Sequence, residues 1–218
     1  MKFKAVLFDF DYTLGDATES IVAGFRYAFE KMGLTPPGRE AVRATVGYLL
    51  RDGYTMLTGD ADPARTDEFV RLFSEKARPM QLETTVLFPG ALELLRALKA
   101  AGARAGVVSS KRSAALVPLL ERLELAPLLD FVIAGDLVKR PKPDPEGLLL
   151  ALEKLDVAKG DALFCGDTVL DAEAAQRAGV HFSAVLNGVT PAEAFGAFPH
   201  DHIAPNLSDL KRWLEEGK

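Results

Sequence analysis

The chain has 218 residues, of which 48% are hydrophobic and 26% are charged, a balance typical of an ordinary globular protein and not of a disordered one. Its formal net charge of −5 offers no basic surface for nucleic acid. A single cysteine, Cys165, argues against a disulfide framework and fits a reducing compartment. The first apolar run is too short for a signal peptide or a membrane span. We therefore expect a cytoplasmic protein, monomeric or homodimeric, without a nucleic-acid or membrane partner.

A buried strand is predicted at residues 5–8, and two acids, Asp9 and Asp11, follow it. The unbroken apolar run is typical of a parallel strand covered on both faces. Ligands bind beyond the carboxyl ends of such strands, and residues two apart in an extended chain point to the same side. Two carboxylates this close repel, so we expect a bound cation or a retained proton. The alternative is an acidic turn in which Asp9 or Asp11 caps a helix.

The next stretch, residues 15–83, has a helical pattern throughout. Apolar residues recur every three or four positions between Ile21 and Met32, which predicts one amphipathic helix. A second helical stretch is expected at residues 38–50. A third should begin after Asp62, which is followed by proline, and end near Pro79.

After Pro89 the pattern alternates between helices and strands. The expected strands are residues 104–108, 130–134, 162–165, 182–186 and 202–204, and the expected helices are residues 91–101, 113–123, 145–155, 171–178 and 207–216. This alternation predicts a doubly wound parallel sheet. The sequence thus indicates an α/β core formed by residues 1–14 and 84–218, with an inserted all-helical domain at residues 15–83.

Polar residues follow successive predicted strands, where an open α/β sheet places its site. Ser109 follows the second strand, Lys142 lies in a proline-rich loop after the third, and Asp167 and Asp171 follow the fourth. Proline restricts the backbone of such a loop and so can hold the lysine in place. Each residue alone has a structural explanation as a helix cap, a turn acid or a surface lysine. Their occurrence together favours a functional site.

This combination of side chains suits phosphoryl transfer through an aspartyl-phosphate. A carboxylate can act as nucleophile and divide hydrolysis into two easier steps. The transferred group carries negative charge on its oxygens, so catalysis depends on positioning and charge neutralisation. A hard divalent cation supplies part of the positive charge, and a lysine with a hydroxyl donor supplies the rest.

The segment Asp-Phe-Asp-Tyr-Thr-Leu resembles the first motif, D-x-D-x-T-L, of the haloacid dehalogenase-like (HAD) hydrolase superfamily, and the later lysine and acidic motifs match as well. The resemblance implies a Rossmann-like core with a helical cap domain. It implies that Asp9 is the nucleophile, Asp11 the general acid and base, and that Ser109 and Lys142 bind the phosphoryl group. It also implies Mg²⁺ bound by Asp9, the backbone carbonyl of Asp11, and Asp167.

Further positions follow from the same resemblance. Asp171 is expected to orient a metal-bound water, and Ser110 and Lys111 are candidates for phosphate or substrate binding. Tyr12 departs from the family pattern, since many members have glycine there. The expected partner is a small phosphorylated metabolite, and the family's helical cap is the segment expected to select it.

The helical insertion, with Gly47 in it, most resembles phosphoglycolate phosphatase-like enzymes. The expected activity is therefore magnesium-dependent hydrolysis of a small phosphomonoester. Alternatives on the same site are a phosphomutase of the β-phosphoglucomutase type, a pyrophosphatase and a sugar-phosphate phosphatase. A phosphoacceptor signalling module and a non-catalytic partner protein are the alternatives outside catalysis.

Overall fold

A computed structural model describes residues 1–216 and divides the chain into two compact units. The core unit comprises Met1–Asp16 and the chain from Leu87 on, and the helical unit comprises Ala17–Val86. The helical unit is thus a single continuous insertion in a core whose two parts are far apart in sequence.

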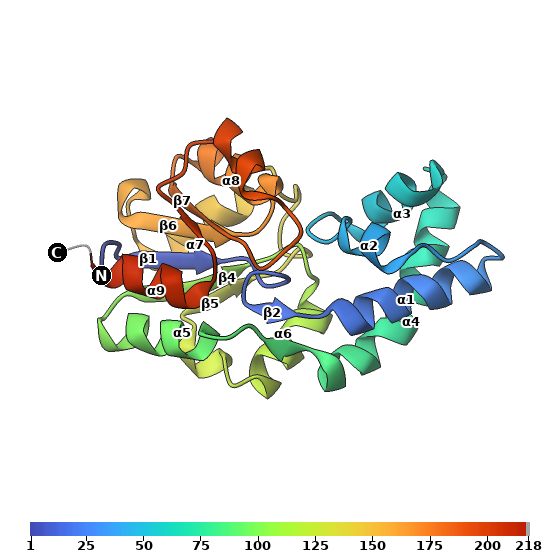
Figure 1. Cartoon of the computed structure of the whole chain (residues 1–218), viewed down its shortest axis with the longest axis horizontal. Coiled ribbons are helices and arrows are strands. Elements are labelled where there is room, and N and C mark those ends of the chain that lie inside the picture. Colours follow the sequence, from blue (N-terminus) through green and yellow to red (C-terminus); the bar gives the residue numbers. More distant parts are fainter. Residues whose placement is uncertain (217–218) are drawn as a thin grey trace. The chain divides into compact units, whose positions relative to one another are not determined.

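A six-stranded sheet forms the centre of the core unit, with the strand order β5–β4–β1–β6–β7–β8 (Figure 1). The strands are β1 (Ala5–Phe8), β4 (Arg104–Val108), β5 (Phe131–Ile133), β6 (Ala162–Gly166), β7 (His181–Val185) and β8 (His202–Ala204). All neighbours pair in parallel, and Phe8 at the end of β1 lies opposite Val107 of β4 and Cys165 of β6. The predicted doubly wound parallel sheet is confirmed, and the carboxyl ends of its strands lie at one edge of the sheet.

Helices cover both faces of the sheet. One apolar cluster includes residues of α5 (Ala91–Ala100), α6 (Ser113–Arg122) and α9 (Leu207–Glu215), and the other includes residues of α7 (Glu146–Leu155) and α8 (Val169–Ala178). The central strand contributes Val6 and Phe8 to the first cluster and Ala5 and Leu7 to the second. Because both faces are buried, β1 is an unbroken apolar run and not an alternating one. Short 3₁₀ turns lie at Ala126–Leu128, Lys159–Asp161 and Ala192–Ala197.

The helical unit contains α1 (Thr18–Lys31), α2 (Arg39–Arg43), α3 (Leu50–Thr58) and α4 (Pro63–Thr84). Its core is rich in aromatic rings, and these are Phe25, Phe29, Tyr54, Phe69 and Phe73. The longest helix, α4, begins where the Asp62 side chain accepts hydrogen bonds from the backbone N–H groups of Ala64 and Arg65. Within residues 1–216, no helix combines the length and the apolar character needed to cross a membrane.

Two expectations for this unit are wrong. Helix α4 does not end near Pro79 but continues to Thr84; the proline removes one backbone donor, yet Ala77 and Gln81 on either side of it are buried, and this packing keeps the helix intact. The stretch at residues 38–50 is not one helix, because α2 ends at Arg43 and Gly47 has a φ of 99°, which no helix can accommodate.

The sequence also missed a two-stranded sheet formed by β2 (Gly15–Asp16) and β3 (Val86–Leu87). These strands lie where the chain passes from one unit to the other. Two residues are too few for a detectable strand periodicity, so only the structure reveals this pairing.

The burial of β1 generates a stability prediction. Leu7 is fully buried, and replacing it with alanine removes apolar contacts and leaves a cavity. We expect Leu7→Ala to lower the free energy of unfolding by about 2–5 kcal/mol in urea denaturation. Leu149→Ala, at a leucine that is 38% exposed on α7, is the matched control and should change it by about 0.5 kcal/mol or less. Equal losses for the two variants would contradict the central role of β1.

Candidate active site

The two acids after β1 are held at the carboxyl edge of the sheet by backbone contacts. The N–H of Asp9 donates to the carbonyl of Cys165 in β6 (2.9 Å), which continues the strand pairing as far as this acid. Just beyond Asp11, Tyr12 has a φ of 61° and its N–H donates to Gly15 O (2.8 Å). This tight turn ends the extended chain directly after the second acid. Glycine is the residue that adopts such a φ most easily, so the tyrosine is the local departure.

Three buried carboxylates gather at this edge. Oxygen atoms of Asp9, Asp167 and Asp171 lie within 4.8 Å of one another. Lys142 reaches into the same cluster, where its Nζ lies 2.5 Å from Asp171 Oδ1 and 3.2 Å from Asp9 Oδ1. Its side chain is only 6% exposed, and the Nζ lies 5.5 Å from the centre of the Phe164 ring. The structure therefore brings together four residues that the sequence placed after three different strands.

Burial and mutual repulsion perturb the pKa values of these groups. Burial raises the pKa of Asp9 to about 6, even though Lys142 beside it acts in the opposite direction. Burial, and then the charges of Asp171 and Asp9, raise the pKa of Asp167 well above its usual range. Burial alone would lower the pKa of Lys142, but the two carboxylates beside it raise the value overall. Burial also raises the pKa of Cys165, as expected of a structural thiol.

Asp171 serves both as a helix cap and as the partner of Lys142. Its Oδ2 accepts hydrogen bonds from Thr168 N (3.0 Å) and Thr168 Oγ1 (2.6 Å), which forms a capping box at the start of α8. Its Oδ1 faces the lysine. The structural and functional interpretations of this acid are thus compatible, because the cap fixes the carboxylate that orients Lys142.

The cluster fits a hard divalent cation. Three acids face one lysine, which leaves an excess of buried negative charge that is costly without a counterion. Among residues 1–216, Asp9 Oδ1 is a buried atom that accepts no hydrogen bond of good geometry. The donors are all oxygen atoms, which suit magnesium or calcium and not zinc or copper. Which of these side chains bind the ion, and whether the carbonyl of Asp11 joins them, stays a prediction.

Asp11 is paired with Lys111 from the loop after β4. The Nζ of Lys111 lies 3.1 and 3.0 Å from the two Asp11 carboxylate oxygens, and the side chains are 10% and 14% exposed. The N–H of Lys111 donates to Ser109 Oγ (3.3 Å). The N–H of Gly135, after β5, donates to Lys111 O (2.9 Å), so a second backbone segment fixes the loop after β4. Lys111 therefore holds the carboxylate of the second acid, which was not foreseen from the sequence.

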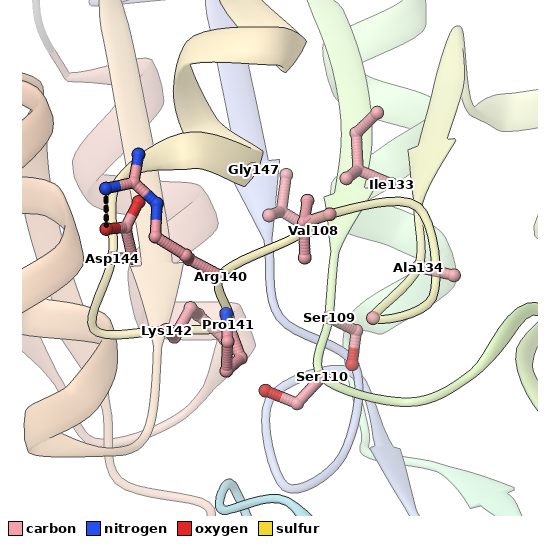
Figure 2. A pocket seen from close by; sticks show the side chains of 12 residues that line it. Val108, Ser109, Ser110, Ile133, Ala134, Arg140, Pro141, Lys142, Asp144 and Gly147 are labelled. Atoms are coloured by element: carbon pink, nitrogen blue, oxygen red, sulfur yellow. Dashed lines mark ion pairs between the residues drawn. The ribbon is translucent and has the colours of Figure 1, made fainter.

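A small pocket borders the same loops (Figure 2). Ser109 and Ser110 lie on one side, and Pro141 and Lys142 lie on the other. Its lining also includes the apolar residues Val108, Ile133 and Val138, and Gly147. The loop after β4 thus presents two hydroxyl groups near the loop that carries the buried lysine.

Three residues that support Asp167 were not recognised as functional in the sequence. Thr13 Oγ1 donates to Asp167 Oδ1 (2.9 Å), and Asn187 Nδ2 donates to Thr13 O (3.0 Å). A Cβ at Gly188 would lie 2.2 Å from Asp167 Oδ2. Asn187 and Gly188 follow β7, so the rule that sites form beyond carboxyl ends could have identified them. Neither residue has an acidic or basic side chain, so neither carried an acid-base signal.

The raised pKa values generate a prediction for the metal-free protein. Between the ordinary pKa of a carboxyl group and the raised values of Asp9 and Asp167, the folded protein binds more protons than the unfolded chain. The free energy of unfolding in EDTA should therefore rise as the pH is lowered from 7 toward 5. Asp167→Asn should be at least as stable as the wild type at pH 7 and should show a smaller rise.

Urea denaturation at the two pH values measures this difference, and Glu153→Gln, an exposed acid on α7, is the control. A wild type that loses stability steadily from pH 7 to pH 5, with Asp167→Asn following it, would contradict the description of the cluster.

Sequence and structure comparisons identify proteins similar to this chain. A family model described as haloacid dehalogenase-like hydrolase matches residues 6–185. A phosphoglycolate phosphatase from Nitrosospira multiformis is 29% identical over 221 residues, which cover 99% of this chain and 97% of the relative. The phosphoglycolate phosphatase of Escherichia coli K12 is 31% identical, over 95% of this chain and 90% of its own length.

Among solved structures, one from Bacteroides fragilis described as a haloacid dehalogenase-like hydrolase superposes with a TM-score of 0.93. It is 37% identical, and the match covers 96% of this chain and all of that one. The matched family region includes the D-x-D loop, the lysine loop and the acids after β6. The motifs, the fold and these matches agree, and the chain belongs to the haloacid dehalogenase-like hydrolase family.

Proposed function

We propose that the protein is a magnesium-dependent phosphatase that hydrolyses a small phosphomonoester through an aspartyl-phosphate on Asp9. The observation that carries this proposal is the environment of Asp9: a buried carboxylate whose Oδ1 lies 3.2 Å from Lys142 Nζ, with two further acids beside it. A carboxylate can act as a nucleophile toward phosphorus, and the surrounding charges suit a phosphoryl group together with a cation.

In the first half-reaction, a carboxylate oxygen of Asp9 attacks phosphorus. A bond forms between this oxygen and phosphorus, and the bond from phosphorus to the leaving oxygen breaks. Asp11 donates a proton to that leaving oxygen, so the product departs as an alcohol. Lys142 and Ser109 bind the phosphoryl oxygens, where their positive charge and hydroxyl donor stabilise the developing charge.

In the second half-reaction, water attacks the phosphorus of the aspartyl-phosphate. Asp11 accepts the water proton, the bond between phosphorus and Asp9 breaks, and inorganic phosphate leaves. Lys111 Nζ contacts both carboxylate oxygens of Asp11, and this contact fixes the proposed general acid and base. The same two acids thus serve both halves of the reaction.

In this proposal Asp9, Asp167 and the backbone carbonyl of Asp11 would hold the Mg²⁺, and Asp171 would support this site by orienting a water. When bound, Mg²⁺ supplies positive charge to the transferred phosphoryl group. The protein's own contribution is to hold the oxygen donors in place. Thr13 fixes Asp167 by its hydroxyl group, and Thr168 fixes Asp171 by a capping box.

For substrate, we propose a phosphoglycolate-like compound, because the curated relatives described above are named for phosphoglycolate. We assign the helical unit as the cap domain that selects the substrate. The support is its place in the chain, directly after the D-x-D loop and inserted as one piece into the core. The core residues described above bind only a phosphoryl group and an ion, so they cannot distinguish one phosphomonoester from another.

We also propose a cytoplasmic location and a monomeric or homodimeric state. The location is supported by the single cysteine, which is buried and unpaired in the described chain.

A phosphate-release screen with magnesium tests the activity. It should include phosphoglycolate, glycerol and sugar phosphates, nucleotides and pyrophosphate, and retention of label from a sugar bisphosphate would identify a mutase instead.

Removing the nucleophile should abolish turnover. Asp9→Asn keeps the size of the side chain but loses the nucleophilic oxygen, so kcat should fall by orders of magnitude while the thermal unfolding curve shows a folded protein. Asp52→Asn, at an exposed aspartate on α3, is the matched control and should keep wild-type turnover. Near-normal kcat for Asp9→Asn, or trapped phosphoenzyme label at another residue, would refute the assignment.

Magnesium binding should depend on pH. Because the pKa of Asp9 is about 6 and that of Asp167 is raised, the ion must displace protons at low pH. Affinity for Mg²⁺, measured by calorimetry, should fall as the pH is lowered from 8 to 5, and Asp167→Asn should bind more weakly with a shallower dependence. Calcium should bind but support little turnover. Affinity that is constant over this range would show that these acids do not hold the ion.

A further inference from the structure

The position of Lys142 depends on a short loop between β5 and α7. The lysine must bring its ammonium group to within 3.2 Å of Asp9 and 2.5 Å of Asp171 while its side chain stays 94% buried. A lysine has a flexible four-carbon side chain, so the backbone that carries it has to be fixed. Figure 2 shows that this loop also carries Arg140 and Asp144, which form an ion pair on its outer side.

Glu146, the first residue of α7, holds the part of this loop that directly precedes Lys142. Its Oε1 accepts a hydrogen bond from the N–H of Lys139 (2.9 Å), and its Oε2 accepts one from the N–H of Arg140 (3.1 Å). One carboxylate thus binds two consecutive backbone donors, which fixes the direction of the chain two residues before Lys142. The Arg140 guanidinium lies 3.7 Å from the same carboxylate, but its side chain is 71% exposed, so this ion pair contributes little.

The end of the loop is held by Asp144. Its N–H donates to Pro141 O (2.9 Å), and its Oδ1 accepts from the N–H of Glu146 (3.0 Å). The loop is therefore closed on both sides of Lys142, and Glu146 takes part in both contacts. Backbone hydrogen bonds to a charged carboxylate are stronger than those between neutral groups. They also lower the pKa of Glu146, with the Lys139 N–H as the largest cause.

The chemistry makes such support necessary. When the aspartyl-phosphate forms, the Asp9 carboxylate becomes an acyl phosphate and loses its negative charge, so Lys142 exchanges this ionic partner for the phosphoryl oxygens. Of the two acids that pair with Lys142, Asp171 is then the one that still carries a negative charge. A lysine held only by its ion pairs would shift at this stage. A lysine on a fixed backbone would stay on the phosphoryl group.

We propose that Glu146 is a positioning residue for catalysis, which binds the backbone of residues 139–140 and so holds Lys142 in the acid cluster. The expected effect of Glu146 on kcat rests on the proposed function, whereas its expected effect on the position of Lys142 does not. The contacts of Glu146 described above are with the loop and not with the acid cluster, so its role is exerted through the loop.

The structural consequence is tested by lysine acetylation of the full-length protein, with peptide mass spectrometry as the readout. In the wild type, Lys142 should react far more slowly than Lys154, an exposed lysine on α7. Glu146→Ala should raise the Lys142 to Lys154 ratio about fivefold or more, because the loop opens locally. Glu146→Gln should give an intermediate ratio, since an amide accepts only one of the two backbone hydrogen bonds.

The kinetic consequence is tested with p-nitrophenyl phosphate. Glu146→Ala should lower kcat about tenfold, Glu146→Gln less, and both should keep a cooperative thermal unfolding curve. In a Lys142→Met background, Glu146→Ala should cause little further loss, because the residue it positions is already gone. Two controls should stay within about twofold of the wild type: Arg140→Ala, which keeps the backbone hydrogen bonds, and Glu153→Ala, at an exposed acid on the same helix.

The outcomes separate this inference from the proposed function. Unchanged Lys142 reactivity in both Glu146 variants, or a full tenfold loss that persists in the Lys142→Met background, would overturn the positioning role. A wild type without phosphatase activity, or a Lys142→Met variant with normal kcat, would overturn the proposed function, while the acetylation result would still decide the role of Glu146.

Discussion

The structure depends on the burial of three carboxylates against a single lysine at the carboxyl edge of the sheet. Charged groups of this kind are costly to bury unless they are paired or bind an ion. The raised pKa values of Asp9 and Asp167 reduce the charge that is buried. The capping box and the ion pair with Lys142 stabilise the charged form of Asp171. The fold thus holds a site that is electrostatically incomplete, and binding of a cation would stabilise the folded state by mass action.

The surrounding elements supply rigidity where the cluster needs it. The central strand β1 is fully buried and fixes the position of Asp9, because the backbone pairing with β6 continues one residue past the end of β1. Helix α8 fixes Asp171 through its own first turn. Lys142 comes from the loop between β5 and α7, and that loop is closed by the carboxylates of Asp144 and Glu146. The loop residues are therefore constrained by side-chain hydrogen bonds where strand pairing is not available.

Much of this arrangement could be predicted from sequence because its signals are local. The apolar run before Asp9, the alternation of helices and strands, and the acids after β6 all follow from periodicity and from the rule about carboxyl ends. What could not be predicted depends on contacts between distant residues. The pairing of Lys111 with Asp11, the support of Asp167 by Thr13, and the continuation of α4 through Pro79 each depend on packing that no single stretch encodes.

Gly188 illustrates how a residue without a side chain can define a charged site. Its backbone passes so close to Asp167 that a Cβ would lie 2.2 Å from Oδ2, a separation that real Cβ atoms do not tolerate. The mutational tolerance of this position is therefore set by a neighbour 21 positions earlier in the chain. A glycine-to-alanine change in a loop is commonly regarded as conservative. Here it would force the carboxylate to move, so natural variation at residue 188 should be interpreted as variation in the acid cluster itself.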